Sequence, residues 1–135
     1  MNNSLMCIML IDDDQNDNFF HEREIKKTNL SIDVITKNSA IDALEYLKSK
    51  KEDKNIQPNL IFLDINMPQM NGWEFLQEYD QLDEEIKDRK IIIMLTSSKN
   101  PDEIARAMTF RSVSDFISKP LTKEKLEDII KNYFI

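Results

Sequence analysis

The chain has 135 residues, with 18 Lys or Arg against 25 Asp or Glu, so its formal net charge is −7. This length predicts one domain over residues 1–135 without a separate effector domain, and the acidic balance disfavours direct nucleic-acid binding, because phosphate contacts need clustered basic side chains. The single glycine, Gly72, excludes a P-loop and a dinucleotide-binding fingerprint, which need several glycines at fixed spacing.

No segment approaches the roughly 20 apolar residues that cross a bilayer, so we expect no membrane contact. Residues 1–4 lack the basic and apolar regions of a secretory signal. The only cysteine, Cys7, lies in an apolar run, which predicts a buried, inert thiol in a reducing compartment. Together these features predict a cytoplasmic protein.

The first strand–helix unit is predicted near the N-terminus. An apolar run over residues 6–11 predicts a strand, which leads into the acidic residues 12–14, and a helix over residues 16–27 follows. The expected inward face of this helix consists of three apolar side chains, Phe19, Phe20 and Ile25. His21 has charged neighbours, so we expect it on an ordinary charged helix surface rather than at a second phosphorylation site.

The second unit combines a short strand over residues 32–35 with a helix that Ser39 caps, because an acidic residue follows Ser39 by three positions. The apolar stripe of this helix is Ile41, Leu44 and Leu47. The charged residues 48–55 predict the end of the helix and a solvated loop.

The third unit contains the most informative stretch of the chain. Consecutive apolar residues over 60–63 predict a strand that is buried on both faces, as in a parallel sheet, and Asp64 ends it. A turn with Pro68 and Gly72 follows. The next helix should bury four apolar side chains, Trp73, Phe75, Leu76 and Tyr79. The charged residues 80–90 then predict a connecting loop.

The fourth unit has a strand over residues 91–95 that leads into Thr96, and a helix that starts at Asn100 and ends near residue 111. In the fifth, a strand with Phe116 and Ile117 leads into Lys119, and a helix begins near residue 122. Alternating strands and helices predict an α/β fold, a flavodoxin-like doubly wound five-stranded parallel sheet in the order 2-1-3-4-5.

Polar residues follow four of the predicted strands. Because the carboxyl ends of parallel strands meet at one edge of a sheet, we expect residues 12–14, Asp64, Thr96 and Lys119 to converge there. Such a set suits a divalent cation, a nucleophile and ligands for phosphoryl oxygens.

Four motifs occur in order, namely Ile11-Asp12-Asp13, Leu63-Asp64-Ile65-Asn66-Met67-Pro68 through Gly72, Leu95-Thr96-Ser97 and Phe116-Ile117-Ser118-Lys119-Pro120. With these motifs the chain resembles, over nearly its whole length, the receiver domain of two-component response regulators, of the single-domain chemotaxis-regulator type. The chain departs from the family pattern at Ser112-Val113, where receivers commonly carry glycine and alanine.

The resemblance implies that Asp64 is the phosphorylation site and becomes an acyl phosphate. It also implies a Mg²⁺ ion held by Asp13 directly, by Asp12 through water, by Asp64 and by the backbone carbonyl of Asn66. Asp14 has no such role and is expected to be loop or helix-start charge.

Three further residues receive roles from the resemblance. Lys119, joined to Pro120 by a bond that the family holds in cis, is expected to pair with Asp64 before transfer and with a phosphoryl oxygen afterwards. Thr96 and Phe116 are expected to form the switch, in which the hydroxyl binds a phosphoryl oxygen and the aromatic ring turns inward.

The implied function is that of a stand-alone response regulator. It accepts a phosphoryl group from a histidine kinase or phosphotransfer protein in a Mg²⁺-dependent, self-catalysed reaction, removes that group by autodephosphorylation, and is otherwise not an enzyme. The expected output is to an unknown protein partner through the surface of the fourth helix, fifth strand and fifth helix.

Three alternatives remain open at this point. The chain could be a phosphorelay intermediate or a degenerate receiver that binds a partner constitutively, although the intact motif residues disfavour the latter. A haloacid-dehalogenase-like phosphatase also has an Asp after an apolar strand, but it usually carries a second acid two residues later, where this chain has Asn66.

Overall fold

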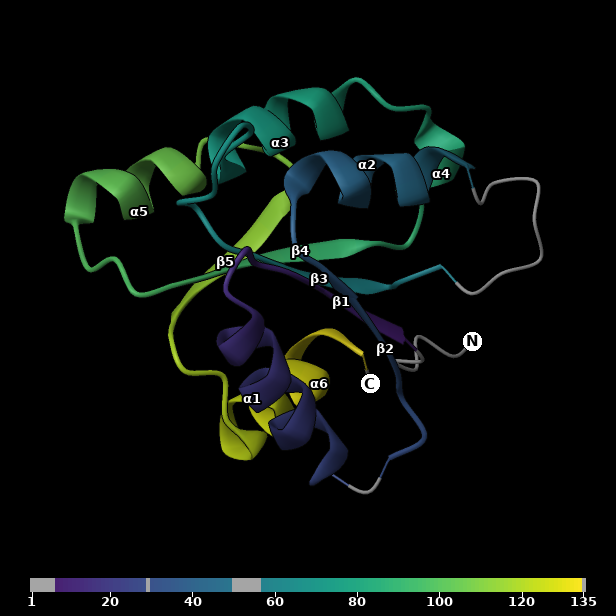
Figure 1. The fold of residues 1–135 in the computed structure, drawn as a ribbon, viewed down its shortest axis with the longest axis vertical. Coiled ribbons are helices and arrows are strands. Elements are labelled where there is room, and N and C mark those ends of the chain that lie inside the picture. The colour runs from purple at the N-terminus through teal and green to yellow at the C-terminus, as the bar shows by residue number, and fades with distance from the viewer. Residues whose placement is uncertain (1–6, 29, 50–56, 135) are drawn as a thin grey trace.

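A five-stranded parallel sheet lies at the centre of the computed structural model, which describes residues 7–28, 30–49 and 57–134, and helices cover both faces of this sheet (Figure 1). The strand order β2-β1-β3-β4-β5 confirms the predicted flavodoxin-like fold. The strands are β1 (Cys7–Ile11), β2 (Asp33–Lys37), β3 (Leu60–Leu63), β4 (Ile91–Thr96) and β5 (Val113–Ser118). The helices are α1 (Gln15–Lys26), α2 (Ala40–Ser49), α3 (Gly72–Asp80), α4 (Glu84–Lys87), α5 (Pro101–Ala107) and α6 (Lys123–Tyr133).

The sheet separates two hydrophobic cores, because successive side chains of a strand point to opposite faces. In β1, Ile8 and Leu10 belong to the core covered by α1 and α6, whereas Met9 and Ile11 belong to the core covered by α2, α3 and α5 (Figure 1). The central strands β1 and β3 are buried along their whole length. This explains why the sequences of β1 and β3 are unbroken apolar runs.

The strand register brings the polar residues that follow the strands to one edge of the sheet. Ile11 pairs with Leu63, and Leu63 pairs with Met94, so β1, β3 and β4 are aligned near their carboxyl ends. Thr96 pairs with Ser118 in β5, the residue before Lys119. The predicted convergence of these polar residues is therefore confirmed.

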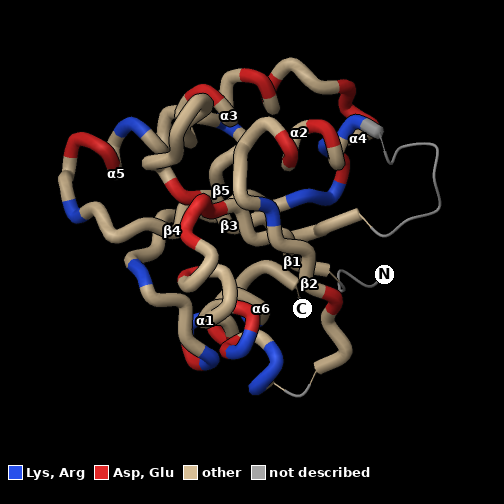
Figure 2. The backbone as a smooth tube through the Cα atoms, viewed as in Figure 1, with Lys and Arg blue, Asp and Glu red and all other residues tan. Residues whose placement is uncertain are grey.

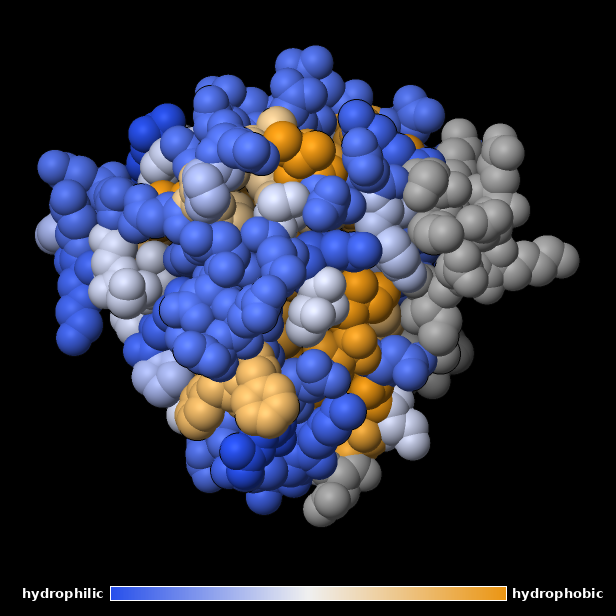
Figure 3. All heavy atoms as spheres, in the orientation of Figure 1, coloured by the Kyte–Doolittle hydropathy of each residue, from blue (hydrophilic) through white to orange (hydrophobic). Residues whose placement is uncertain are grey.

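Helix α1 differs from its predicted orientation. Phe19 and Phe20 are 63% and 42% exposed, and a pale orange patch marks the surface near this helix (Figure 3). The side chains that α1 buries are Asn18, His21, Glu24 and Ile25. The expectation that both phenylalanines face inward was wrong, because α1 turns a polar face toward the edge of the sheet.

Several predicted boundaries also shift. The segment over residues 80–90 contains the short helix α4, and α5 ends at Ala107 rather than near residue 111. Strand β5 begins at the buried Val113, which pairs with Ile92 of β4. The Ser39 cap is confirmed, since its Oγ accepts a hydrogen bond from the Asp42 backbone at 3.1 Å.

Ile41, predicted to lie on the inner stripe of α2, is exposed. Most of the predicted loop over residues 48–55 lies outside the described residues. Within the part of the chain that the structure describes, none of the helices combines the length and the apolar character needed to cross a membrane.

Candidate functional site

Three carboxylates meet at the carboxyl edge of the sheet. Asp12 and Asp13 follow β1 and Asp64 follows β3, and each contributes an oxygen such that all three oxygens lie within 4.8 Å of one another. Acidic residues accordingly line the backbone just before α1 (Figure 2). Asp12 and Asp64 are buried, whereas Asp13 is exposed. Hard oxygen donors at this spacing fit a divalent cation such as Mg²⁺.

Burial has the largest effect on the pKa of the Asp64 carboxyl. It raises the pKa of the Asp64 carboxyl to about 6, and the negative charge of Asp12 adds to this effect. Lys119 and hydrogen bonds from the Ile65 backbone and the Thr96 side chain act in the opposite direction. A cation between the carboxylates would offset the repulsion between the negative charges of Asp12 and Asp64.

The only glycine of the chain is required by close packing against Asp64. A Cβ atom on Gly72 would lie 2.6 Å from the Asp64 backbone oxygen, a contact that side chains cannot make. The Gly72 N–H donates to the Ile65 carbonyl at 2.8 Å, so the start of α3 is joined to the loop that carries Asp64. Asn71 and Glu74 form a capping box at the same helix start.

Lys119 contacts three carboxylates. Its Nζ donates to Asp12 Oδ2 and Asp17 Oδ2, both at 2.7 Å, and lies 3.6 Å from Asp64 Oδ2. Burial lowers the pKa of the Lys119 ammonium group, but the hydrogen bonds to Asp12 and Asp17 outweigh that effect and leave the pKa above its ordinary value. The Lys119-Pro120 peptide bond is cis, as predicted.

The predicted switch residues lie on neighbouring strands. Thr96 ends β4, is buried, and joins the hydrogen bonds around the Asp64 carboxylate. Its Oγ also accepts a hydrogen bond from the Ser98 backbone at 3.3 Å. Phe116 of β5 is half-buried, pairs with Met94, and packs against the core beneath α2, α3 and α5. Asn66 is exposed beyond Asp64.

His21 lies beneath the site rather than on the surface. It is 2% exposed and lines a small cavity together with Asp12, Asn18 and Asp64. Desolvation lowers the pKa of its imidazole, which favours the neutral form. The expectation of an ordinary charged helix surface was therefore wrong, because the turn of α1 that carries His21 faces the acidic edge of the sheet.

Two residues near the site had no predicted role, Asp17 and Asn18. The Asn18 side chain donates to the Asp12 carbonyl at 2.9 Å, and Asp17 reaches Lys119. The spacing of Asn18, His21 and Ile25, at positions i, i+3 and i+7, is that of one helix face and could have identified the inner side of α1. Nothing in the sequence pairs Asp17 with a residue that follows it by 102 positions.

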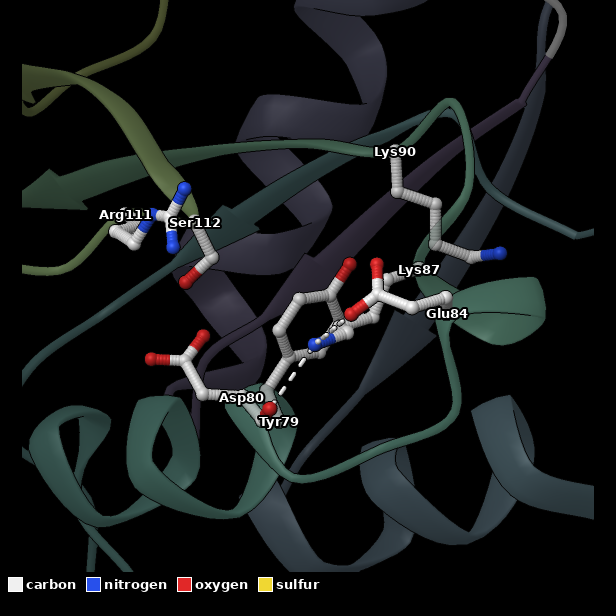
Figure 4. Close-up of a pocket in the computed structure, with 7 residues that line it drawn as sticks. All are labelled: Tyr79, Asp80, Glu84, Lys87, Lys90, Arg111 and Ser112. Carbon is white, nitrogen blue, oxygen red and sulfur yellow. Dashed lines mark hydrogen bonds and ion pairs between the residues drawn. The ribbon is translucent and has the colours of Figure 1, made fainter.

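A larger cavity of about 490 Å³ lies away from these residues (Figure 4). Its lining residues are Tyr79, Asp80, Glu84, Lys87, Lys90, Arg111 and Ser112. Lys87 in this cavity donates to the Asp80 carbonyl at 2.9 Å and forms an ion pair with Glu84 at 3.3 Å. Since Lys90 and Ser112 directly precede β4 and β5, this cavity marks the opposite, amino edge of the sheet.

Comparison with known proteins gives one consistent result. The family model of the response regulator receiver domain matches residues 8–131. The chain is 28% identical over 125 residues to the response regulator Rcp1 of Synechocystis sp., which covers 92% of the chain and 81% of Rcp1. It is 30% identical over 128 residues to the two-component response regulator ARR6 of Arabidopsis thaliana, covering 90% of the chain and 64% of ARR6.

A longer relative and a solved structure also match the chain. The chain is 42% identical over 82 residues to the hybrid signal transduction histidine kinase C of Dictyostelium discoideum, covering 58% of the chain but only 7% of that kinase. The crystal structure of a two-component response regulator from Cytophaga hutchinsonii matches with a TM-score of 0.86 and 30% identity, over 96% of this chain and 97% of that one.

Proposed function

The chain belongs to the response regulator receiver domain family of two-component signalling, and on this premise we propose that Asp64 accepts a phosphoryl group in a Mg²⁺-dependent reaction. The observation that carries the proposal is the position of Asp64, buried at the end of β3, with Asp12, Asp13 and Lys119 around it. Family membership makes the haloacid-dehalogenase-like phosphatase the weaker interpretation.

In the proposed reaction an Asp64 carboxylate oxygen attacks the phosphorus atom of the donor. A phosphorus–oxygen bond to Asp64 forms, the bond to the donor breaks, and the leaving group keeps its electron pair. Asp12, Asp13, Asp64 and the Asn66 carbonyl would hold Mg²⁺, which when bound offsets the negative charge of the carboxylates and the phosphoryl oxygens. Lys119 supplies a second positive charge at the same site.

Phosphorylation would then be read out by Thr96 and Phe116. The Thr96 hydroxyl already belongs to the hydrogen bonds around Asp64, so a phosphoryl group there would give it a new acceptor. Phe116 is half-buried and packs against the core beneath α2, α3 and α5, and an inward turn of its ring would change the surface of β5. The output surface would be the one formed by α5, β5 and α6, which correspond to the predicted fourth helix, fifth strand and fifth helix.

The partners follow from the same proposal. The donor would be a histidine kinase or a phosphotransfer protein in the cytoplasm, and the acyl phosphate would be lost by autodephosphorylation. The receiver would act as a single domain through a protein partner, as a terminal regulator or as a phosphorelay intermediate.

The test is intact-protein mass spectrometry after incubation with Mg²⁺ and acetyl phosphate. The parent chain should gain one base-labile phosphoryl group, whereas Asp64→Asn should gain none and keep its circular dichroism spectrum. Ser97→Ala, a change beside Thr96 that leaves the carboxylates intact, serves as the matched control and should still be labelled. A labelled Asp64→Asn protein would remove Asp64 as the acceptor.

A further inference from the structure

Lys119 has a partner that the proposed phosphoryl chemistry does not explain. Asp17 lies in the first turn of α1, outside the cluster of Asp12, Asp13 and Asp64. We propose that Asp17 is a positioning residue, which holds the Lys119 ammonium group beside α1 and competes for it with the phosphoryl group on Asp64. This inference rests on the proposed function of Asp64.

The distances rank the partners of Lys119. Its Nζ lies 2.7 Å from Asp17 Oδ2 and from Asp12 Oδ2, which is the length of a charge-assisted hydrogen bond. The 3.6 Å separation from Asp64 Oδ2 exceeds that length. The Lys119 side chain is only 15% exposed, so these carboxylates rather than water provide most of its hydrogen-bond acceptors.

Local structure fixes the turn that carries Asp17. The Asp14 carboxylate caps α1 and accepts hydrogen bonds from the backbone N–H groups of Asn16 at 2.9 Å and Asp17 at 3.3 Å. The Asp14 N–H in turn donates to Asp12 Oδ1 at 3.0 Å. On the other side of Asp17, the buried Asn18 side chain donates to the Asp12 carbonyl. Asp17 therefore cannot follow Lys119 toward Asp64 without loss of these contacts.

Asp12 and Asp17, the two close partners of Lys119, differ in whether a divalent cation in the acidic cluster competes for them. Asp12 belongs to the acidic cluster, so a divalent cation there competes with Lys119 for its carboxylate. Asp17 does not belong to the cluster and keeps its negative charge available to Lys119. A phosphoryl group on Asp64 must therefore attract Lys119 away from Asp17.

The experiment measures beryllofluoride binding to the full chain at saturating Mg²⁺ by ¹⁹F NMR. This anion mimics a phosphoryl group on a carboxylate and needs no kinase. Asp17→Asn should bind beryllofluoride about three- to tenfold more tightly than the parent, because a neutral amide holds the Lys119 ammonium group less strongly than a carboxylate does. Equal binding by the parent and Asp17→Asn would overturn the inference.

Two further variants separate positioning from general charge. Asp14→Asn removes a negative charge from the same helix start but keeps a capping oxygen and does not contact Lys119, so it should bind like the parent. In a Lys119→Met background, Asp17→Asn should give no gain. A similar gain in either case would mean that Asp17 acts only through its charge and would overturn the inference. A parent chain that binds no beryllofluoride would instead reject the proposed function, and the inference with it.

Discussion

Asp64 is held in a position where its ionised form is unfavourable. The residue is buried and lies beside Asp12, and its carboxyl pKa is raised to about 6, well above the ordinary value for an aspartate. A carboxylate that served only the stability of the fold would be better placed in water. An ionisable group with a strongly perturbed pKa in a polar cluster is typical of a functional site, which agrees with the proposed role of Asp64 as phosphoryl acceptor.

The raised pKa predicts how stability depends on pH in the metal-free protein. The folded state binds more protons than the unfolded state between the two pKa values, about 4 and about 6, so the contribution of Asp64 to stability falls as pH rises through this window. With EDTA present, Asp64→Asn should be more stable than the parent by about 3 kcal/mol at pH 7. The difference should largely vanish near pH 4.

Urea denaturation of both proteins at several pH values checks this prediction. Asp128→Asn changes an exposed aspartate on α6 and provides the control, since its stability difference from the parent should stay small across the same range. An Asp64→Asn advantage that grows as the pH is lowered would contradict the sign of the predicted effect.

At the scale of single elements, α1 shows how a local pattern can mislead. Its adjacent phenylalanines are its largest apolar side chains, yet they point outward, and Arg23 lies over the Phe19 ring at 5.8 Å. The inner face is mostly polar because it lies at the carboxyl edge of the sheet, beside Asp12. Ile25 is the apolar residue of α1 that enters the core beneath α1 and α6.

The orientation of α1 predicts opposite effects for two apolar truncations. Ile25→Ala should lower the free energy of unfolding by about 2–5 kcal/mol, because it leaves a cavity in the core. Phe19→Ala on the same helix should change it by less than about 1 kcal/mol, because the ring is mostly exposed. Chemical denaturation measures both values. A larger loss for Phe19→Ala than for Ile25→Ala would place α1 in the orientation that its sequence pattern first indicated.

At the scale of the whole molecule, the site exists only because the sheet is assembled. Asp12 and Asp13 come from the end of β1, Asp64 from the end of β3, and Lys119 from the end of β5. The unfolded chain holds none of these groups at a fixed distance from another. Binding of a cation to the cluster must therefore stabilise the folded state as a whole.

Mg²⁺ should accordingly raise the stability of the parent chain, by about 2.7 kcal/mol when its concentration is 100 times the dissociation constant. Asp13→Asn removes an exposed carboxylate of the cluster, and the Mg²⁺-dependent gain should be largely lost at the same concentration. Thermal denaturation with Mg²⁺ and with EDTA measures the gain. Asp128→Asn should keep the full gain, and a full gain in Asp13→Asn would show that the ion binds elsewhere.

The sequence alone was sufficient for much of the fold and for the principal site residues. Unbroken apolar runs predicted β1, β3 and β4, because strands covered on both faces need apolar residues at every position. The same argument predicted that Asp12, Asp64, Thr96 and Lys119 share one edge of the sheet, since parallel strands end together. These features depend on local composition and on a topology that has few alternatives.

Only the tertiary structure decided which side chains of α1 join the strand-end residues at that edge. The inward turn of His21 and the contact between Asp17 and Lys119 depend on how α1 rotates against the sheet, and an apolar pattern with two phenylalanines indicated a different rotation. The need for Gly72 likewise appears only when α3 packs on the Asp64 backbone. Contacts between residues far apart in the chain follow from packing, which no local sequence pattern encodes.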